Sequence, residues 1–331
     1  MRISVIGAGS WGTALARLAA LQDHPVRLWA YETEVIESIR VRRVNELFLP
    51  DIELPSSLFV TNDLAETTRS AEILLIAVPS QHVREVLVKV APHVPPDALL
   101  VSATKGIEEE TLLRMSEVIE QVMRPNGESR VVVLSGPTFA REVASDQPTA
   151  LVAASHRREL ARRVQEELSS LTFRIYTNDD VIGVELGGAL KNVIAIAAGV
   201  CAGLGLGHNP VAALITRGLA ELSRLSVALG GRRKTLAGLA GMGDLVLTCT
   251  GQLSRNRTVG VELGKGKPLA AILSSMRMVA EGVPTTHAAL ALARRHGVEM
   301  PITFQMHRLL NGETTPAEAI RKLMSRPLKG E

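Results

Sequence analysis

The stretch that decides the fold is Gly7-Ala8-Gly9-Ser10-Trp11-Gly12. It directly follows the apolar run Ile3–Ile6, and Thr13-Ala14-Leu15-Ala16 then opens a helical segment. In such a turn the first glycine permits a tight bend, the second lets the backbone approach a pyrophosphate, and the third lets the helix pack on the strand. The free N–H groups at the start of the helix would face the phosphates. This context, more than the glycine pattern itself, predicts a dinucleotide-binding turn.

Short apolar runs recur through the first half of the chain, with helical segments between them. The runs are continuous rather than alternating, which is typical of parallel strands covered on both faces. The expected strands are Ile3–Ile6, Val26–Trp29, Leu58–Val60, Ile73–Val78, Leu99–Val101, Val131–Leu134, Ala150–Ala154 and Phe173–Tyr176. The expected crossover helices are Thr13–Leu21, Val83–Val90 and Glu109–Met123. Together they predict a doubly wound α/β domain of the Rossmann type.

The strand pattern stops after about Asn178, and Ala, Leu and Gly dominate the remainder of the chain. The expected helices there are Gly187–Gly199, Pro210–Leu229, Leu269–Met276, Thr286–Gly297 and Pro316–Met324. At 331 residues the chain is too long for one ordinary core. We therefore expect a Rossmann domain over residues 1–180 and an all-α domain, which would hold the substrate, over residues 181–331.

The composition narrows the classes of partner. The net charge is only +3 and no basic block occurs, so neither nucleic acid nor an anionic membrane is expected as the main partner. Cys201 and Cys249 lack the spacing of metal ligands and are expected to be buried thiols in a reducing cytoplasm, with no metal site. The weakly charged stretch from Leu186 to Thr216 contains six glycines and predicts a buried helix rather than a membrane span. The N-terminus lacks the pattern of a signal peptide, so we expect a cytoplasmic protein.

The choice between NAD and NADP depends on the end of the second strand. An acidic residue there selects the ribose 2′-hydroxyl, and an arginine selects a 2′-phosphate. Glu32 stands one position past the usual acidic site, and no arginine is next to it. Tyr31 could stack on the adenine, although both residues could equally belong to a solvated loop. The acidic residue and the lack of a neighbouring arginine weakly favour NAD over NADP.

Lys191 is the most informative single residue. It is the only Asp, Glu, Lys or Arg between Leu186 and Thr216, and its neighbours on a helix would be Gly187, Ile194 and Ala195. Burial of an unpaired ammonium costs several kcal/mol or lowers its pKa. A lysine with a lowered pKa suits proton transfer to a carbonyl oxygen. The alternative is a lysine whose side chain extends to solvent.

Polar residues also stand where the strands of such a sheet end, and again late in the chain. Val78-Pro79-Ser80, Ala103-Thr104-Lys105-Gly106 and Ser135–Ala140 follow expected strands, which is where an α/β protein binds its ligand. Ser254-Arg255-Asn256 forms a donor cluster suited to a phosphate, although Ser254 could simply cap a helix. Asp244 could orient a lysine or accept a substrate hydroxyl.

These segments resemble the bacterial type of NAD(P)-dependent glycerol-3-phosphate dehydrogenase. The resemblance spans nearly the whole chain in the family's order, and its last three motifs are the most specific. The motifs are GAGSWGTALA (7–16), VPS (78–80), ATKG (103–106), SGPTFA (135–140), ELGGALKNVIAIAAG (185–199), ITRGLAE (215–221) and GMGDLVLTCTGQLSRNR (241–257). One departure is Tyr31-Glu32, where many relatives carry a basic residue, so a strict preference for NADP is not implied.

The resemblance implies hydride exchange between a nicotinamide and dihydroxyacetone phosphate or sn-glycerol 3-phosphate, in a cytoplasmic homodimer that supplies phospholipid synthesis. Lys191 would be the general acid and base. The substrate would be surrounded by Lys105, Gly136, Thr138, Lys191, Asp244, Ser254, Arg255 and Asn256. The cofactor, NAD or NADP, would contact Gly7, Gly9, Ser10, Trp11, Gly12, Tyr31, Lys105, Ala140, Arg255, Val279 and Glu281.

Two alternatives use the same features. A 6-phosphogluconate or β-hydroxyacid type of dehydrogenase would share the fold and an active lysine. A nicotinamide-sensing protein without turnover would share the turn, but it would not need a desolvated ammonium.

Overall fold

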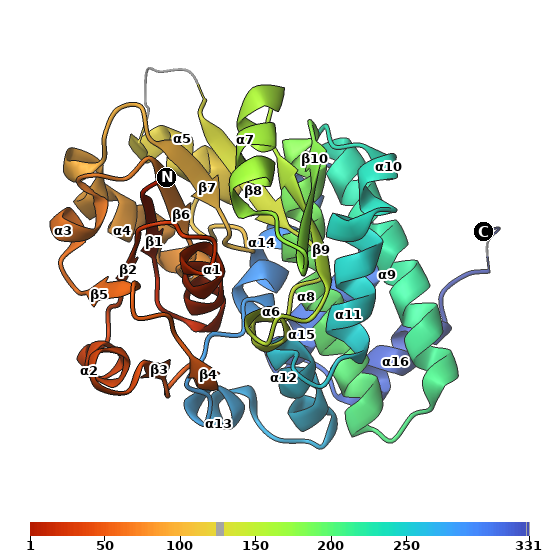
Figure 1. Cartoon of the computed structure of the whole chain (residues 1–331). Coiled ribbons are helices and arrows are strands. Elements are labelled where there is room, and N and C mark those ends of the chain that lie inside the picture. The colour runs from red at the N-terminus through yellow and green to blue at the C-terminus, as the bar shows by residue number, and fades with distance from the viewer. Residues whose placement is uncertain (124–128, 329, 331) are drawn as a thin grey trace.

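The computed structural model describes residues 1–123, 129–328 and 330. Its N-terminal half is built on one eight-stranded sheet of order β10-β9-β8-β7-β6-β1-β2-β5 (Figure 1). The strands are β1 (Ile3–Ile6), β2 (Val26–Trp29), β5 (Phe59–Thr61), β6 (Ile73–Ile76), β7 (Leu99–Ser102), β8 (Val131–Ser135), β9 (Thr149–Ala154) and β10 (Phe173–Asn178). The order places β1 inside the sheet, third from the β5 edge, between β6 and β2.

The sheet is parallel except at one step. β1 pairs in parallel with both β2 and β6, in registers that start at Ile3↔Val26 and Ile3↔Ile73. β9 runs antiparallel to β8, because the chain returns through a short connection that holds only one small helix. The inner strands β1, β6, β7 and β8 are buried along their whole length because both faces of the sheet are covered there. Ile73 and Leu75 of β6 join one buried cluster and Leu74 and Ile76 join another.

Helices cover both faces of this sheet, which confirms the expected Rossmann fold (Figure 1). They are α1 (Ser10–Ala20), α2 (Thr33–Arg42), α3 (Leu64–Thr68), α4 (Val83–Val90), α5 (Met115–Met123), α6 (Ala140–Ala144) and α7 (Arg158–Leu168). A small hairpin of β3 (Val44–Asn45) and β4 (Leu49–Glu53) follows α2.

The expected helix Glu109–Met123 is too long at its N-terminal end. Leu112 has a left-handed φ of 63°, and Ile107 forms a bridge with Arg114, so the helix begins only at Met115. The helix expected from Thr13 begins earlier, at Ser10, because the glycine turn leads straight into it.

The C-terminal half is helical, as expected. Its helices are α8 (Val181–Gly203), α9 (His208–Ala228), α10 (Arg233–Leu236), α11 (Asp244–Thr250), α12 (Arg255–Gly264), α13 (Leu269–Ser274), α14 (Gly282–Arg295), α15 (Pro301–Leu310) and α16 (Pro316–Met324). By length and composition α8 is the one described helix that could cross a membrane, but 94% of its apolar window is buried inside the protein. It is therefore the central core helix of this half.

The backbones of α8 and α12 touch each other. A Cβ on Gly199 of α8 would lie 2.1 Å from the carbonyl oxygen of Arg257, and a Cβ on Gly260 of α12 would lie 1.9 Å from that of Ile196. Side chains at these two positions would separate the helices. Glycine therefore fixes how closely α12 approaches the helix that carries Lys191.

Candidate active site

The turn after β1 is formed as its glycines require. Gly7 has a φ of 109°, and a Cβ there would lie 2.8 Å from the carbonyl oxygen of Ala77. A Cβ on Gly12 would lie 1.8 Å from the carbonyl oxygen of Gly7. By contrast, a Cβ on Gly9 would meet no protein atom within 4 Å. The backbone at Gly9 therefore faces open space at the N-terminus of α1, and this space fits the pyrophosphate of a dinucleotide.

A segment of the helical half lies against this turn. Ser10 Oγ donates to the carbonyl oxygen of Phe48 at 2.6 Å and lies 3.1 Å from the sulfur of Met278. Val279, a predicted cofactor contact, is therefore next to the turn and is exposed. The indole Nε1 of Trp11 is buried without a partner among the described residues, so it is a donor available to a bound group.

The other predicted cofactor residues lie at the same edge of the sheet. Tyr31, just past β2, is 79% exposed, with its ring 6.3 Å from that of Trp29. Glu32 is the N-cap residue of α2, and its side chain makes no capping hydrogen bond. Ala140 begins α6, which packs against α1. Exposure of Tyr31 leaves its ring free to stack on a ligand.

Glu281 connects the helical half to the end of β6. Its carboxylate accepts the backbone N–H of Ser80 at 2.8 Å and the Ser80 hydroxyl. Burial raises the pKa of Glu281, and the hydrogen bonds from Ser80 oppose that effect. A Cβ on Gly106 would lie 2.4 Å from Ser80 Oγ, so glycine there makes room for this contact.

A buried polar cluster is formed by Lys191, Asp244 and Thr248. Lys191 is only 7% exposed, so its side chain does not extend to solvent. Its Nζ donates to Asp244 Oδ1 and, at 2.8 Å, to Thr248 Oγ1. Burial lowers the pKa of Lys191 to about 7, although the Asp244 carboxylate opposes this change. As expected, Lys191 has no partner on its own helix, all of which the structure describes. Its ammonium is nevertheless paired, because Asp244 reaches it from α11, as the lysine-orienting role considered for Asp244 requires.

Lys105 approaches Asp244 from the other side. Its Nζ donates to Asp244 Oδ2 at 2.7 Å, to the carbonyl oxygen of Gly136 at 2.8 Å and to Thr138 Oγ1 at 3.2 Å. These three contacts use all three hydrogens of the ammonium. Asp244, which is fully buried, therefore holds one lysine from each half of the protein.

The Ser254–Asn256 cluster stands at the N-terminus of α12. Ser254 caps this helix by accepting the N–H of Arg257, so Ser254 has the role of a helix cap, which was the alternative to a phosphate contact. Asn256 donates to Asn192 Oδ1 at 2.9 Å and accepts the N–H of Gly282 at 2.8 Å. Arg255 is exposed to solvent, yet desolvation by the surrounding protein lowers its pKa.

The structure adds residues that the sequence did not single out. Thr248 and Asn192 both contact residues of the predicted site. Thr248 lies one helical turn after Asp244, and Asn192 directly follows Lys191. The i, i+4 spacing from Asp244 could have indicated Thr248, because such residues share one face of a helix.

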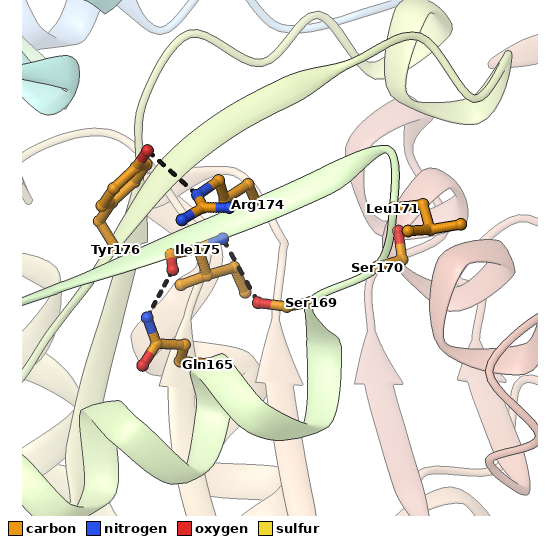
Figure 2. A pocket seen from close by; sticks show the side chains of 7 residues that line it. All are labelled: Gln165, Ser169, Ser170, Leu171, Arg174, Ile175 and Tyr176. Carbon is orange, nitrogen blue, oxygen red and sulfur yellow. Dashed lines mark hydrogen bonds between the residues drawn. The ribbon is translucent and has the colours of Figure 1, made fainter.

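A separate hollow of about 320 Å³ lies beside the edge strand β10 (Figure 2). Gln165 donates to the carbonyl oxygen of Ile175 at 2.7 Å, and Arg174 donates to the hydroxyl of Tyr176 at 3.1 Å. None of the predicted site residues lines it. The contact from Gln165 satisfies one backbone acceptor of this edge strand.

Comparisons with known proteins agree with this geometry. Family models described as the N-terminus and C-terminus of NAD-dependent glycerol-3-phosphate dehydrogenase match residues 2–161 and 180–321. A glycerol-3-phosphate dehydrogenase [NAD(P)+] of Koribacter versatilis is 62% identical over 328 residues, which are 98% of this chain and 97% of the relative. One from Citrifermentans bemidjiense is 56% identical over 330 residues, 100% of this chain and 98% of the relative. A crystal structure of glycerol-3-phosphate dehydrogenase from Coxiella burnetii has a TM-score of 0.94 at 41% identity and covers 98% of this chain and 99% of that one.

Proposed function

This chain belongs to the NAD-dependent glycerol-3-phosphate dehydrogenase family, and we propose that Lys191 is the general acid and base of its reaction. The enzyme interconverts dihydroxyacetone phosphate and sn-glycerol 3-phosphate with NAD or NADP. This membership excludes the two alternatives, a 6-phosphogluconate type of dehydrogenase and a sensor without turnover.

The observation that carries the proposal is the hydrogen bonding of the buried Lys191. Two of its three ammonium hydrogens are directed to Asp244 and Thr248. The third has no acceptor among the described residues and remains for a substrate oxygen. With a pKa of about 7, the lysine is about half protonated near neutral pH, so it can give or take a proton.

The proton transfer follows from this state. When dihydroxyacetone phosphate is reduced, negative charge develops on the carbonyl oxygen, and protonated Lys191 stabilises that charge and donates its proton. In the reverse direction, neutral Lys191 removes the proton of the C2 hydroxyl. Asp244 and Thr248 hold Nζ in place during both steps. The Gly7–Gly12 turn would hold the pyrophosphate of the dinucleotide, and the nicotinamide of the bound cofactor would supply or accept the hydride.

The phosphate end of the substrate is assigned to Arg255 and the N-terminus of α12. Arg255 offers two parallel N–H donors, and the first N–H groups of the helix add a positive dipole end. Binding energy from this remote group fixes the reacting carbon beside Lys191. The hydrogen bonds of Asn256 are used within the protein, which gives it the role of holding Asn192 and the start of α14.

The test of the general acid is Lys191→Ala. We expect kcat to fall by about 10²-fold or more, because general acid–base catalysis supplies that range. The control is Lys89→Ala, which removes an exposed lysine paired with Glu85. If Lys191→Ala turned over at a rate near that of the control, Lys191 would have no part in the mechanism.

The test of the phosphate contact is Arg255→Ala. We expect a higher KM for dihydroxyacetone phosphate, by about tenfold or more for the loss of a charge-assisted contact. Lys265→Ala, at the far end of the same helix, is the matched control. An unchanged KM in Arg255→Ala would exclude this assignment.

We also propose that NADH is preferred to NADPH. Glu32 and Glu34 stand at the start of α2, where their carboxylates would repel a 2′-phosphate. The measurement is the ratio of kcat/KM for the two cofactors with dihydroxyacetone phosphate. A ratio in favour of NADPH would contradict the preference.

We also propose where the enzyme acts and what its product is used for. The enzyme would act in the cytoplasm as a homodimer and supply glycerol 3-phosphate for phospholipids. Two buried free thiols and a fully embedded α8 support a reducing compartment without membrane insertion. Light scattering of the purified protein tests the dimer. A strain that lacks the gene should grow only when glycerol 3-phosphate is added, and this growth test checks the proposed role in phospholipid synthesis.

A further inference from the structure

Asn45 is a fully buried amide beside the glycine turn, in the β3–β4 hairpin. Its Nδ2 donates to the carbonyl oxygen of Ala8 at 2.8 Å and to Thr13 Oγ1 at 2.9 Å. Its Oδ1 accepts the N–H of Phe48 at 3.1 Å. A buried amide with both donors directed at one short segment holds that segment in a single conformation.

The carbonyl group that Asn45 holds belongs to the turn. Ala8 lies between Gly7 and Gly9, and its oxygen also accepts the hydroxyl of Thr13 at 3.1 Å. In a trans peptide unit the C=O and the following N–H point in opposite directions. With the Ala8 oxygen directed inwards, the N–H of Gly9 must point outwards.

The surroundings of Gly9 are open, because a Cβ there would meet no neighbouring protein atom within 4 Å. Within the described residues, the Gly9 N–H has no acceptor. Rotation of the Ala8–Gly9 peptide plane would replace this donor with carbonyl lone pairs, which repel phosphate oxygens. The direction of this one peptide therefore decides whether the turn attracts or repels a pyrophosphate.

We propose that Asn45 is a positioning residue for the cofactor, which fixes the Ala8–Gly9 peptide so that the Gly9 N–H donates to the pyrophosphate. The inference rests on the proposed assignment of the Gly7–Gly12 turn to the cofactor. The hairpin thereby has a function in binding, because Phe48 links the same amide to Ser10 at the start of α1.

The first test is Asn45→Asp, which keeps the shape and the contact with Phe48 but removes both donors. We expect the KM for NADH to rise by about tenfold at pH 8, because a hydrogen bond to a charged group is lost. The kcat and the KM for dihydroxyacetone phosphate should stay within about twofold of wild type, since Asn45 contacts neither lysine. Lowering the pH should restore affinity relative to wild type, because the introduced carboxyl donates again once protonated.

A second variant covers the case in which Asn45→Asp does not fold. Thr13→Val removes the other donor to the Ala8 oxygen and should also raise the KM for NADH selectively. The matched control is Ser38→Ala, because Ser38 Oγ donates to the carbonyl oxygen of Val44 at 2.6 Å and so holds the same hairpin without touching the turn. An equal rise of the KM for NADH in Ser38→Ala would overturn the proposal. A KM for NADH within twofold of wild type in the Asn45 and Thr13 variants that fold would overturn it as well.

Gly9→Ala separates this inference from the assignment on which it rests. The added methyl group meets no neighbouring protein atom within 4 Å, so it fits the protein, but it extends into the open space at Gly9 in which the pyrophosphate is proposed to bind. If Gly9→Ala leaves the KM for NADH unchanged, the turn is not the cofactor site and the proposed function fails at that point. If Gly9→Ala weakens NADH but the Asn45 and Thr13 variants do not, only the role of Asn45 is wrong.

Discussion

Asp244→Asn is the most informative perturbation of the active site. The substitution keeps the shape of the side chain and removes the negative charge that stands between Lys191 and Lys105. The pKa of Lys191 is already lowered to about 7 by burial, and the Asp244 carboxylate limits that decrease. Without the carboxylate, burial and the positive charge of Lys105 act on Lys191 unopposed. We therefore expect a further decrease in its pKa.

The size of the effect follows from the contact distances. A charge in direct contact changes a pKa by about 1–3 units, which would bring the pKa of Lys191 to about 4–6. At pH 7 the protonated fraction would fall from about one half to between about one tenth and one thousandth. Because only protonated Lys191 can donate to the carbonyl oxygen, kcat for the reduction should fall by about 5-fold to 500-fold at pH 7.

The assay is kcat for the reduction of dihydroxyacetone phosphate, measured between pH 5 and pH 9 at saturating cofactor. Wild type should lose activity as the pH rises through about 7, and Asp244→Asn should lose it at a lower pH. The matched control is Asp180→Asn, a buried carboxylate that caps the same helix, α8, away from the lysine. A midpoint that stayed in place or moved to higher pH in Asp244→Asn would refute the reasoning.

Three further outcomes concern stability. The pKa of Lys191 is lowered from 10.5 to about 7 on folding. Between these pH values the unfolded chain therefore binds more protons than the folded one. The free energy of unfolding of wild type should rise by up to about 5 kcal/mol as the pH increases through this window. Lys191→Met should lack most of this gain in urea unfolding at pH 7 and pH 10, and an identical gain would contradict the assignment. Gly12→Ala should lower the melting temperature and abolish turnover, because its Cβ would lie 1.8 Å from the carbonyl oxygen of Gly7; a melting temperature equal to that of wild type would show that the turn can relax. Glu221→Ala should cost about 1–3 kcal/mol, because Glu221 accepts backbone N–H groups at the start of α15, with Ile302 at 2.6 Å; thermal melts measure this loss, and activity at 25 °C should persist.

The inner strands could be predicted from sequence because each is a nearly continuous apolar run buried on both faces. The β3–β4 hairpin could not be predicted, since its strands are only two and five residues long and mix apolar with polar residues. Its stability comes from contacts such as that between Asn45 and Ala8, 37 positions apart. The reversal of β9 was not visible either. A run such as Leu151–Ala154 is equally apolar in a parallel and an antiparallel strand, and only the short connection decides its direction.

The active site could be predicted in part for a similar reason. A single lysine in a long apolar helix is unusual enough to indicate chemistry. Its partner Asp244 is 53 positions away, and no local pattern predicts which carboxylate reaches a given lysine across two helices. The use of Ser254 as a helix cap and of Asn256 within the protein also depends on tertiary contacts.

The backbone contact between α8 and α12 has a consequence for which substrates fit. Lys191 stands on α8 and Arg255 begins α12. At Gly199 and Gly260 the main chains of the two helices meet directly, with no side chain at that point that could move aside. The spacing between the proton donor and the phosphate anchor is therefore set by two main chains in contact. A ketone with its phosphate one carbon further from the carbonyl could gain that length only if one helix slid along the other. The enzyme would then select substrates by chain length before any side chain recognised their chemistry.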